Sequence, residues 1–80
     1  MVIASGFLEV NELNDVERVL GELKLRGVRI EGVNEEKVVF LIEKETITDA
    51  KIEIDSLNGI EGIRNVYLTY YSMEGAEEEK

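Results

Sequence analysis

One pattern occurs twice along this sequence: an alternating segment, a segment with helical spacing, and a second alternating segment. The pair Gly27-Val28 in the first copy corresponds to Gly62-Ile63 in the second. Each copy predicts two strands that are connected by a helix in a right-handed crossover. Two copies build one four-stranded antiparallel sheet with both helices on one face. The repeat therefore predicts an α+β fold of the ferredoxin-like kind, with chain order βαββαβ.

Alternation of apolar and polar residues predicts where the strands lie. They are expected over Val2–Val10, Val28–Val33, Lys37–Glu43 and Asn65–Tyr71. Apolar residues at helical spacing predict helices within about residues 11–25 and 47–58. In this topology the first and third strands occupy the centre of the sheet, and the other two form its edges.

Polar residues mark the expected helix starts and the end of the domain. Asn11 or Asn14 can cap the first helix, and Thr46, with Asp49 three residues later, can cap the second. Ile52 lies off the apolar stripe of that second helix. Residues 73–80 lack periodicity and carry four glutamates against one lysine. We therefore divide the chain into a ferredoxin-like domain over residues 1–72 and an acidic, disordered tail over residues 73–80.

Composition excludes several classes of function. The chain has 80 residues, of which 44% are hydrophobic and 34% charged, as in one small globular domain. It has no cysteine and no histidine, which removes disulfides, thiolate metal sites and imidazole chemistry. The formal net charge of −9 opposes binding to nucleic acid. No apolar run approaches the ~18 residues of a membrane span, and the start of the sequence does not resemble a signal peptide.

The carboxylates are numerous, but the sequence ties none of them to a base, a nucleophile or a metal ligand. We therefore expect no enzyme, no cofactor and no metal. A binding role to a basic partner suits the acidic charge better than a catalytic one. Neither a membrane nor a nucleic acid is expected as the partner.

The two faces of the predicted sheet differ in a way that indicates binding. The helices need the more apolar face, which assigns to the core Leu8, Val28, Ile30, Val38, Phe40, Ile42, Val66 and Leu68. The opposite, open face then carries Ser5, Phe7, Arg29, Glu31, Val39, Leu41, Tyr67, Thr69 and Tyr71. Each large apolar side chain left uncovered forgoes about 1.5–3 kcal/mol, so such a patch indicates an interaction site. A partner peptide, self-association, and a different register through a bulge near Gly6 all remain open.

The closing part of the sequence resembles a known family. The segment Leu57–Tyr70, with Glu61-Gly62-Ile63, Val66, Leu68 and Tyr70, is similar to the end of NapD proteins, cytoplasmic assembly chaperones of periplasmic nitrate reductase. Ser5–Leu8, the Gly27-Val28 turn and the acidic end also fall where that family has equivalents. The chain departs from the family at Tyr71, where a histidine is usual, and at Arg26 and Glu61, where a proline often precedes the turn glycine.

The resemblance implies a specific function. NapD-type proteins have a ferredoxin-like fold and bind the twin-arginine signal peptide of the catalytic subunit NapA as a helix on the open sheet face. They hold back export until the molybdenum cofactor is inserted. The implied partner is the signal peptide of such an exported molybdenum reductase. The peptide-binding residues would be an apolar platform of Phe7, Val39, Leu41, Tyr67 and Tyr71, with Glu9, Glu31 and Glu43 as an acidic rim.

A small-molecule sensor or oligomerisation domain of the ACT or Lrp type is the alternative. It shares the chain order βαββαβ and pairs its sheets or edges in oligomers. A glycine-rich ligand loop after the first strand would favour that alternative, but this place holds Asn11-Glu12-Leu13.

Overall fold

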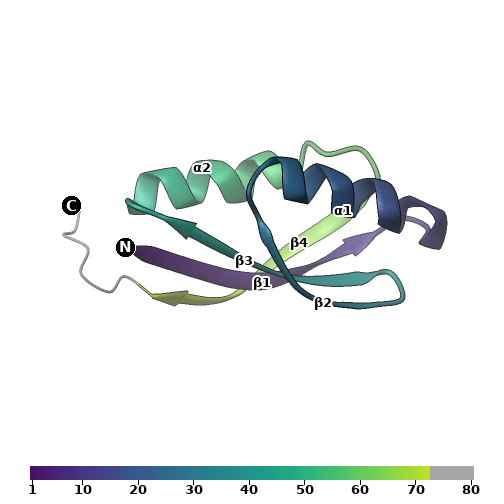
Figure 1. Ribbon diagram of the computed structural model, residues 1–80, viewed down its shortest axis with the longest axis horizontal. Helices are drawn as coiled ribbons and strands as arrows, with labels where there is room; N and C mark the ends of the chain where they lie inside the picture. The colour runs from purple at the N-terminus through teal and green to yellow at the C-terminus, as the bar shows by residue number, and fades with distance from the viewer. Residues whose placement is uncertain (73–80) are drawn as a thin grey trace.

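The computed structural model describes residues 1–72; the acidic segment expected over residues 73–80 lies outside the described residues. Within residues 1–72 the elements are β1 (Val2–Val10), a short 3-10 helix η1 (Leu13–Asp15), α1 (Val16–Leu25), β2 (Arg29–Asn34), β3 (Lys37–Lys44), α2 (Ile47–Leu57) and β4 (Ile63–Ser72). The strands form one antiparallel sheet in the order β2-β3-β1-β4. Both helices lie over the same face of that sheet (Figure 1). The predicted ferredoxin-like fold is confirmed.

The two helices begin differently. The side-chain oxygen of Thr46 accepts a hydrogen bond from the backbone N–H of Asp49 at 3.1 Å, which confirms the predicted cap of α2. The prediction of Asn11 or Asn14 as the cap of α1 is wrong, because the chain first makes the 3-10 turn η1 and α1 starts only at Val16. The carboxylate of Asp15 instead accepts from the guanidinium of Arg18 at 2.8 Å.

The core lies between the helices and the covered face of the sheet. It consists of Leu8, Val10, Val19, Leu23, Val28, Val38, Phe40, Ile42, Leu57 and Ile60, with Ile30 and Val66 partly buried against it. The prediction fails at Leu68, which is 47% exposed although it lies on the covered side of β4. Leu68 is opposite Gly6, which has no side chain to pack against it, and β4 is an edge strand.

Gly6 is required by the close approach of two strands. A Cβ atom added to Gly6 would overlap the backbone carbonyl oxygen of Tyr67 on β4. Any side chain at this position would therefore push β1 and β4 apart. The structure thus uses a glycine in a central strand to keep the edge strand in register.

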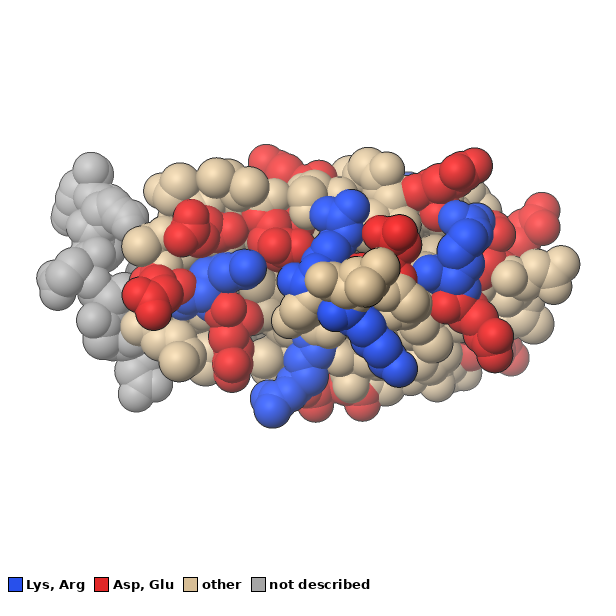
Figure 2. Space-filling model, turned by 45° about the horizontal axis from the view of Figure 1, so that its top comes forward, with Lys and Arg blue, Asp and Glu red and all other residues tan. Residues whose placement is uncertain are grey.

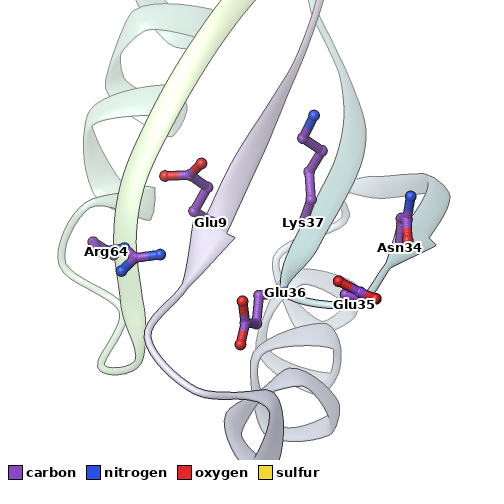
Figure 3. Close-up of a pocket in the computed structure, with 6 residues that line it drawn as sticks. All are labelled: Glu9, Asn34, Glu35, Glu36, Lys37 and Arg64. Atoms are coloured by element: carbon purple, nitrogen blue, oxygen red, sulfur yellow. The ribbon is translucent and has the colours of Figure 1, made fainter.

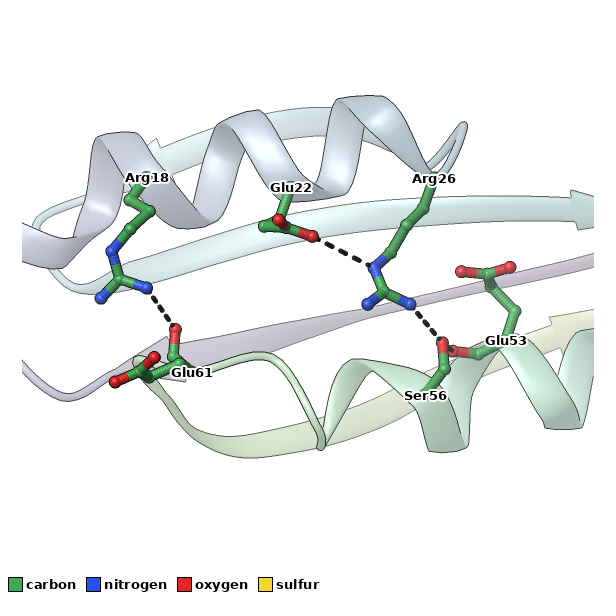
Figure 4. Close-up of polar contacts among 6 residues, drawn as sticks. All are labelled: Arg18, Glu22, Arg26, Glu53, Ser56 and Glu61. Carbon is green, nitrogen blue, oxygen red and sulfur yellow. Dashed lines mark hydrogen bonds and ion pairs between the residues drawn. The ribbon is translucent and has the colours of Figure 1, made fainter.

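Polar contacts hold the helix layer together (Figure 4). The guanidinium of Arg18 donates to the backbone oxygen of Glu61 at 2.9 Å, and that of Arg26 donates to the Ser56 hydroxyl at 3.0 Å. Arg26 also lies 3.7 Å from a carboxylate oxygen of Glu22. Arg18 of α1 and Arg26, the residue after its last turn, thereby connect this helix to α2 and to the loop that follows α2.

Charges of both signs are interspersed over the helix side of the molecule (Figure 2). Such a surface is that of a solvated layer rather than an apolar contact. Within residues 1–72, neither helix is both long enough and apolar enough to cross a membrane.

Candidate functional site

The face of the sheet opposite the helices is covered by no element of residues 1–72 (Figure 1). Its apolar side chains come from the two central strands and from the edge strand β4. We call them the apolar platform, and the structure places in it Ile3, Phe7, Val39, Leu41, Tyr67 and Tyr70. They lie on neighbouring strands and form one continuous surface.

One row of the platform runs across the sheet through Phe7. Phe7 is paired with Val39 of β3 on one side and with Tyr67 of β4 on the other. The rings of Phe7 and Tyr67 lie 4.7 Å apart with an interplanar angle of 32°. The ammonium group of Lys37 lies 4.4 Å from the centroid of the Phe7 ring, a cation–π geometry. Phe7 is therefore half-buried by its neighbours, while Val39 and Tyr67 present their side chains to the outside.

The next row runs through Ser5. It is paired with Leu41 on β3 and with Tyr70 on β4, and Tyr70 is 58% exposed. Ile3 follows on the same face of β1, because side chains two residues apart point to the same side. Phe7, Val39, Leu41 and Tyr67 thus lie on the face where the sequence predicted them. The sequence prediction did not include Ile3 or Tyr70 in this surface.

The prediction that Tyr71 lies on the open face is wrong, and a β-bulge is the reason. The register between β1 and β4 shifts by one residue between Ser5 and Gly6, so that Thr69 has no partner of its own. Beyond that shift Tyr70 is opposite Ser5, and Tyr71 is opposite Ala4 on the helix-covered side. The hydroxyl of Thr69 donates to the backbone oxygen of Ser5 at 3.2 Å, which holds the bulge.

The acidic residues expected at the rim do not lie together. A carboxylate oxygen of Glu9 accepts from the side-chain amide of Asn65 at 3.4 Å, and Glu31 pairs with Arg29 at 3.8 Å. Glu43 is exposed beside Ile3 at the opposite end of β1 from Glu9. The rim therefore offers separate carboxylates at different places rather than one acidic site.

A depression of about 230 Å³ lies at the end of the sheet near Glu9 (Figure 3). It is lined by charged and polar groups of both signs, namely Glu9, Asn34, Glu35, Glu36, Lys37 and Arg64. Among residues 1–72, no group of three or more acidic side chains is placed to hold a metal ion. What this side of the molecule offers is apolar contact over several strands, bordered by single charges.

Known proteins give no further guide to what the apolar platform binds. No family model matches this chain, and comparisons with curated proteins and with solved structures give no match either.

Proposed function

We propose that the apolar platform binds an amphipathic helical peptide and that the protein acts as a cytoplasmic chaperone of the NapD type. Its partner would be the twin-arginine signal peptide of an exported molybdenum reductase such as NapA. The observation that carries the proposal is the apolar platform on the uncovered face of the sheet. The sequence resemblance supplies the kind of peptide.

The dimensions of the platform suit a helix. Its residues lie on three adjacent strands, and strands are ~4.7–4.9 Å apart, so the platform is about 10 Å wide. An α-helix with its side chains is ~10–12 Å in diameter. Along β1 the platform extends from Ile3 to Phe7, about 14 Å at ~3.4 Å per residue. A helix covers that length in roughly nine residues, enough for apolar anchors at positions i, i+3, i+4 and i+7.

Charge supports the same partner. The described domain carries 14 acidic and 8 basic residues, so it is acidic without the final segment. Glu43 lies next to the platform, and no partner side chain is found for it within residues 1–72. A carboxylate at the end of an apolar surface can pair with an arginine at one end of a helix whose apolar side lies on the sheet. Mutual attraction would chiefly speed association.

The test is a calorimetric titration of a synthetic twin-arginine signal peptide into the protein, followed by the same titration into variants. Leu41→Ala and Phe7→Ala should each weaken binding about tenfold, which corresponds to ~1.4 kcal/mol. Ile52→Ala is the matched control, because Ile52 is also an exposed apolar residue, but on α2. It should leave the affinity unchanged.

Two results would contradict the proposal. One is an affinity that Leu41→Ala and Phe7→Ala do not alter. The other is an equal loss for Ile52→Ala, which would place the contact on the helix side. NMR chemical shifts of the complex give an independent reading, since the largest changes should lie in β1, β3 and β4.

A further inference from the structure

The ring of Phe7 in the apolar platform is in contact with a charged side chain of the protein itself. Lys37 is the first residue of β3 and lies two residues before Val39, so its side chain is on the open face of the sheet. Its ammonium nitrogen lies 4.4 Å from the centroid of the Phe7 ring, within the ~6 Å of a cation–π contact. Tyr67 flanks Phe7 from the strand on the other side. A ligand that covers Phe7 therefore meets the Lys37 ammonium.

Lys37 is held in this position by few interactions. Its side chain is exposed, and it forms no ion pair within residues 1–72. Glu9 is its partner across the strands, but the Glu9 carboxylate accepts instead from the amide of Asn65. A cation–π contact is weakest where it is exposed to water. The contact between Lys37 and Phe7 can therefore open without disturbing the rest of the sheet.

The depression at the end of the sheet offers the ammonium a second position. Lys37 is one of the residues that line it, and the other charged lining residues are Glu9, Glu35, Glu36 and Arg64. Neither Glu35 nor Glu36 forms an ion pair within the part of the chain that the structure describes. Figure 3 shows the Lys37 side chain directed away from these two glutamates. Three carboxylates against one guanidinium favour the entry of another cation, and the flexible stem of a lysine allows it to turn.

We propose that Lys37 is a movable cover of the apolar platform. It lies over Phe7 in the free protein and turns toward the depression when the apolar side of a helical peptide reaches Phe7. This inference rests on the proposed function, because the peptide is what displaces the lysine. The cover lowers the affinity of every ligand by the contact that it must break. It thereby limits binding at Phe7 to ligands whose apolar side chains compensate for that loss, and it protects the platform from weaker apolar contacts.

The first test is the affinity of the twin-arginine peptide for two variants of Lys37, measured by calorimetric titration. Lys37→Gln should bind about two- to fivefold more tightly than the wild type, because no cation has to leave the ring. Lys37→Arg should bind more weakly than the wild type at the same net charge, because a guanidinium stacks better on an aromatic ring than an ammonium does.

Lys51→Gln is the matched control, because Lys51 is exposed on α2 and its loss changes the net charge equally. It should gain less affinity than Lys37→Gln. Equal gains in the two glutamine variants would overturn the proposal, since the lower net charge would then explain both. A weaker affinity of Lys37→Gln would also overturn it, because Lys37 would then contribute to the complex rather than compete with it.

The second test follows the lysine directly by NMR. In the free protein the ring current of Phe7 should shift the protons on Cε of Lys37 upfield, and Phe7→Leu should remove this shift. Saturation of the wild type with the peptide should remove it as well. A shift that persists in a complex whose Val39 and Tyr67 signals have moved would show that Lys37 stays in place, and would overturn the proposal.

A separate measurement distinguishes failure of the cover from failure of the proposed function. A wild type and a Lys37→Gln variant that both bind no peptide would contradict the proposed function. The cover is then tested with Nile red, a neutral apolar dye, whose fluorescence should rise more with Lys37→Gln than with the wild type or with Lys51→Gln. Equal fluorescence for all three proteins would overturn the cover itself.

Discussion

The two faces of the sheet are built from the same strands, but one packs against the helices and the other is left uncovered. On β1, the residues that face the helices are fully buried, and those on the other face are only half-buried. On β3, Phe40 is fully buried, whereas its neighbour Val39 is exposed. The helices cover only one face, so apolar residues on the other contribute less to folding than their size allows. The comparison separates residues that hold the fold from residues available to a partner.

The largest effect is expected from a pair of phenylalanines that sit on adjacent central strands and opposite faces. Phe40→Ala should lower the free energy of unfolding by ~3–5 kcal/mol, because it leaves a cavity in the core. Phe7→Ala should lower the free energy of unfolding by only about 1 kcal/mol, because the Phe7 side chain is half-buried and removing it exposes less apolar surface to water. Urea denaturation of the two variants measures both values. Equal losses would show that the open face is as important for folding as the covered one.

The next effect concerns Gly6 of β1, which the backbone of β4 approaches closely. Gly6→Ala should destabilise the domain by about 1–3 kcal/mol, because the added methyl group overlaps the carbonyl of Tyr67. Gly32→Ala is the matched control, since a Cβ at Gly32 meets no atom within 4 Å. Thermal unfolding should show a lower midpoint for Gly6→Ala alone. A similar loss in both variants would mean that the cost comes from replacing a strand glycine rather than from contact between β1 and β4.

The two consecutive tyrosines of β4, Tyr70 and Tyr71, test the difference between the two faces through a smaller expected effect. Tyr70→Ala should weaken peptide binding and change stability little, because Tyr70 lies exposed on the open face. Tyr71→Ala should do the reverse, since Tyr71 is opposite Ala4 and its hydroxyl oxygen is buried. Each effect should be on the order of 1 kcal/mol. Peptide titration and thermal unfolding of both variants measure the two effects. If Tyr71→Ala weakened binding and Tyr70→Ala lowered stability, the assignment of the two tyrosines to opposite faces would be reversed.

The smallest expected effect is electrostatic. Glu43→Gln should slow peptide association less than tenfold and alter dissociation less, because an exposed charge mainly steers the encounter. Glu12→Gln removes an equal charge from the loop after β1 and serves as the control. Stopped-flow kinetics at low and high salt measures the difference, which should shrink as the Debye length falls from ~10 Å at 0.1 M to ~3 Å at 1 M. Identical kinetics for both variants would remove Glu43 from the binding site.

The architecture was predictable because it depends on features that are local in the sequence. Alternation in β1 and β3 is uninterrupted, and each of these strands pairs on both sides, so its two faces follow from residue order alone. The cap at Thr46 is a short-range interaction with Asp49 and was predicted for the same reason. Ile52, which the helical stripe left unplaced, is exposed on α2.

The wrong cap of α1 is a local error, since the 3-10 turn at Leu13–Asp15 precedes the helix. The errors on β4 have non-local causes. The exchange of Tyr70 and Tyr71 arises from a bulge, which depends on pairing between β1 and β4 at opposite ends of the chain. The exposure of Leu68 depends on the position of β4 at the edge of the sheet and on the glycine opposite it. Neither is visible in the alternation of β4 itself. On the central strands the predicted platform lacked only Ile3, whereas on the edge strand Tyr70 and Tyr71 were exchanged.

The bulge at Thr69 also has a consequence for how this surface can change over evolution. A single residue inserted or deleted in β4 reverses the two sides only for the positions beyond it. The stretch Asn65–Leu68, which is paired regularly with β1, keeps its orientation. The insertion or deletion of one residue at this position can therefore change which side chain of β4 faces a ligand, without a substitution elsewhere. Homologous chains that differ in length at this point should differ in ligand preference before they differ in fold.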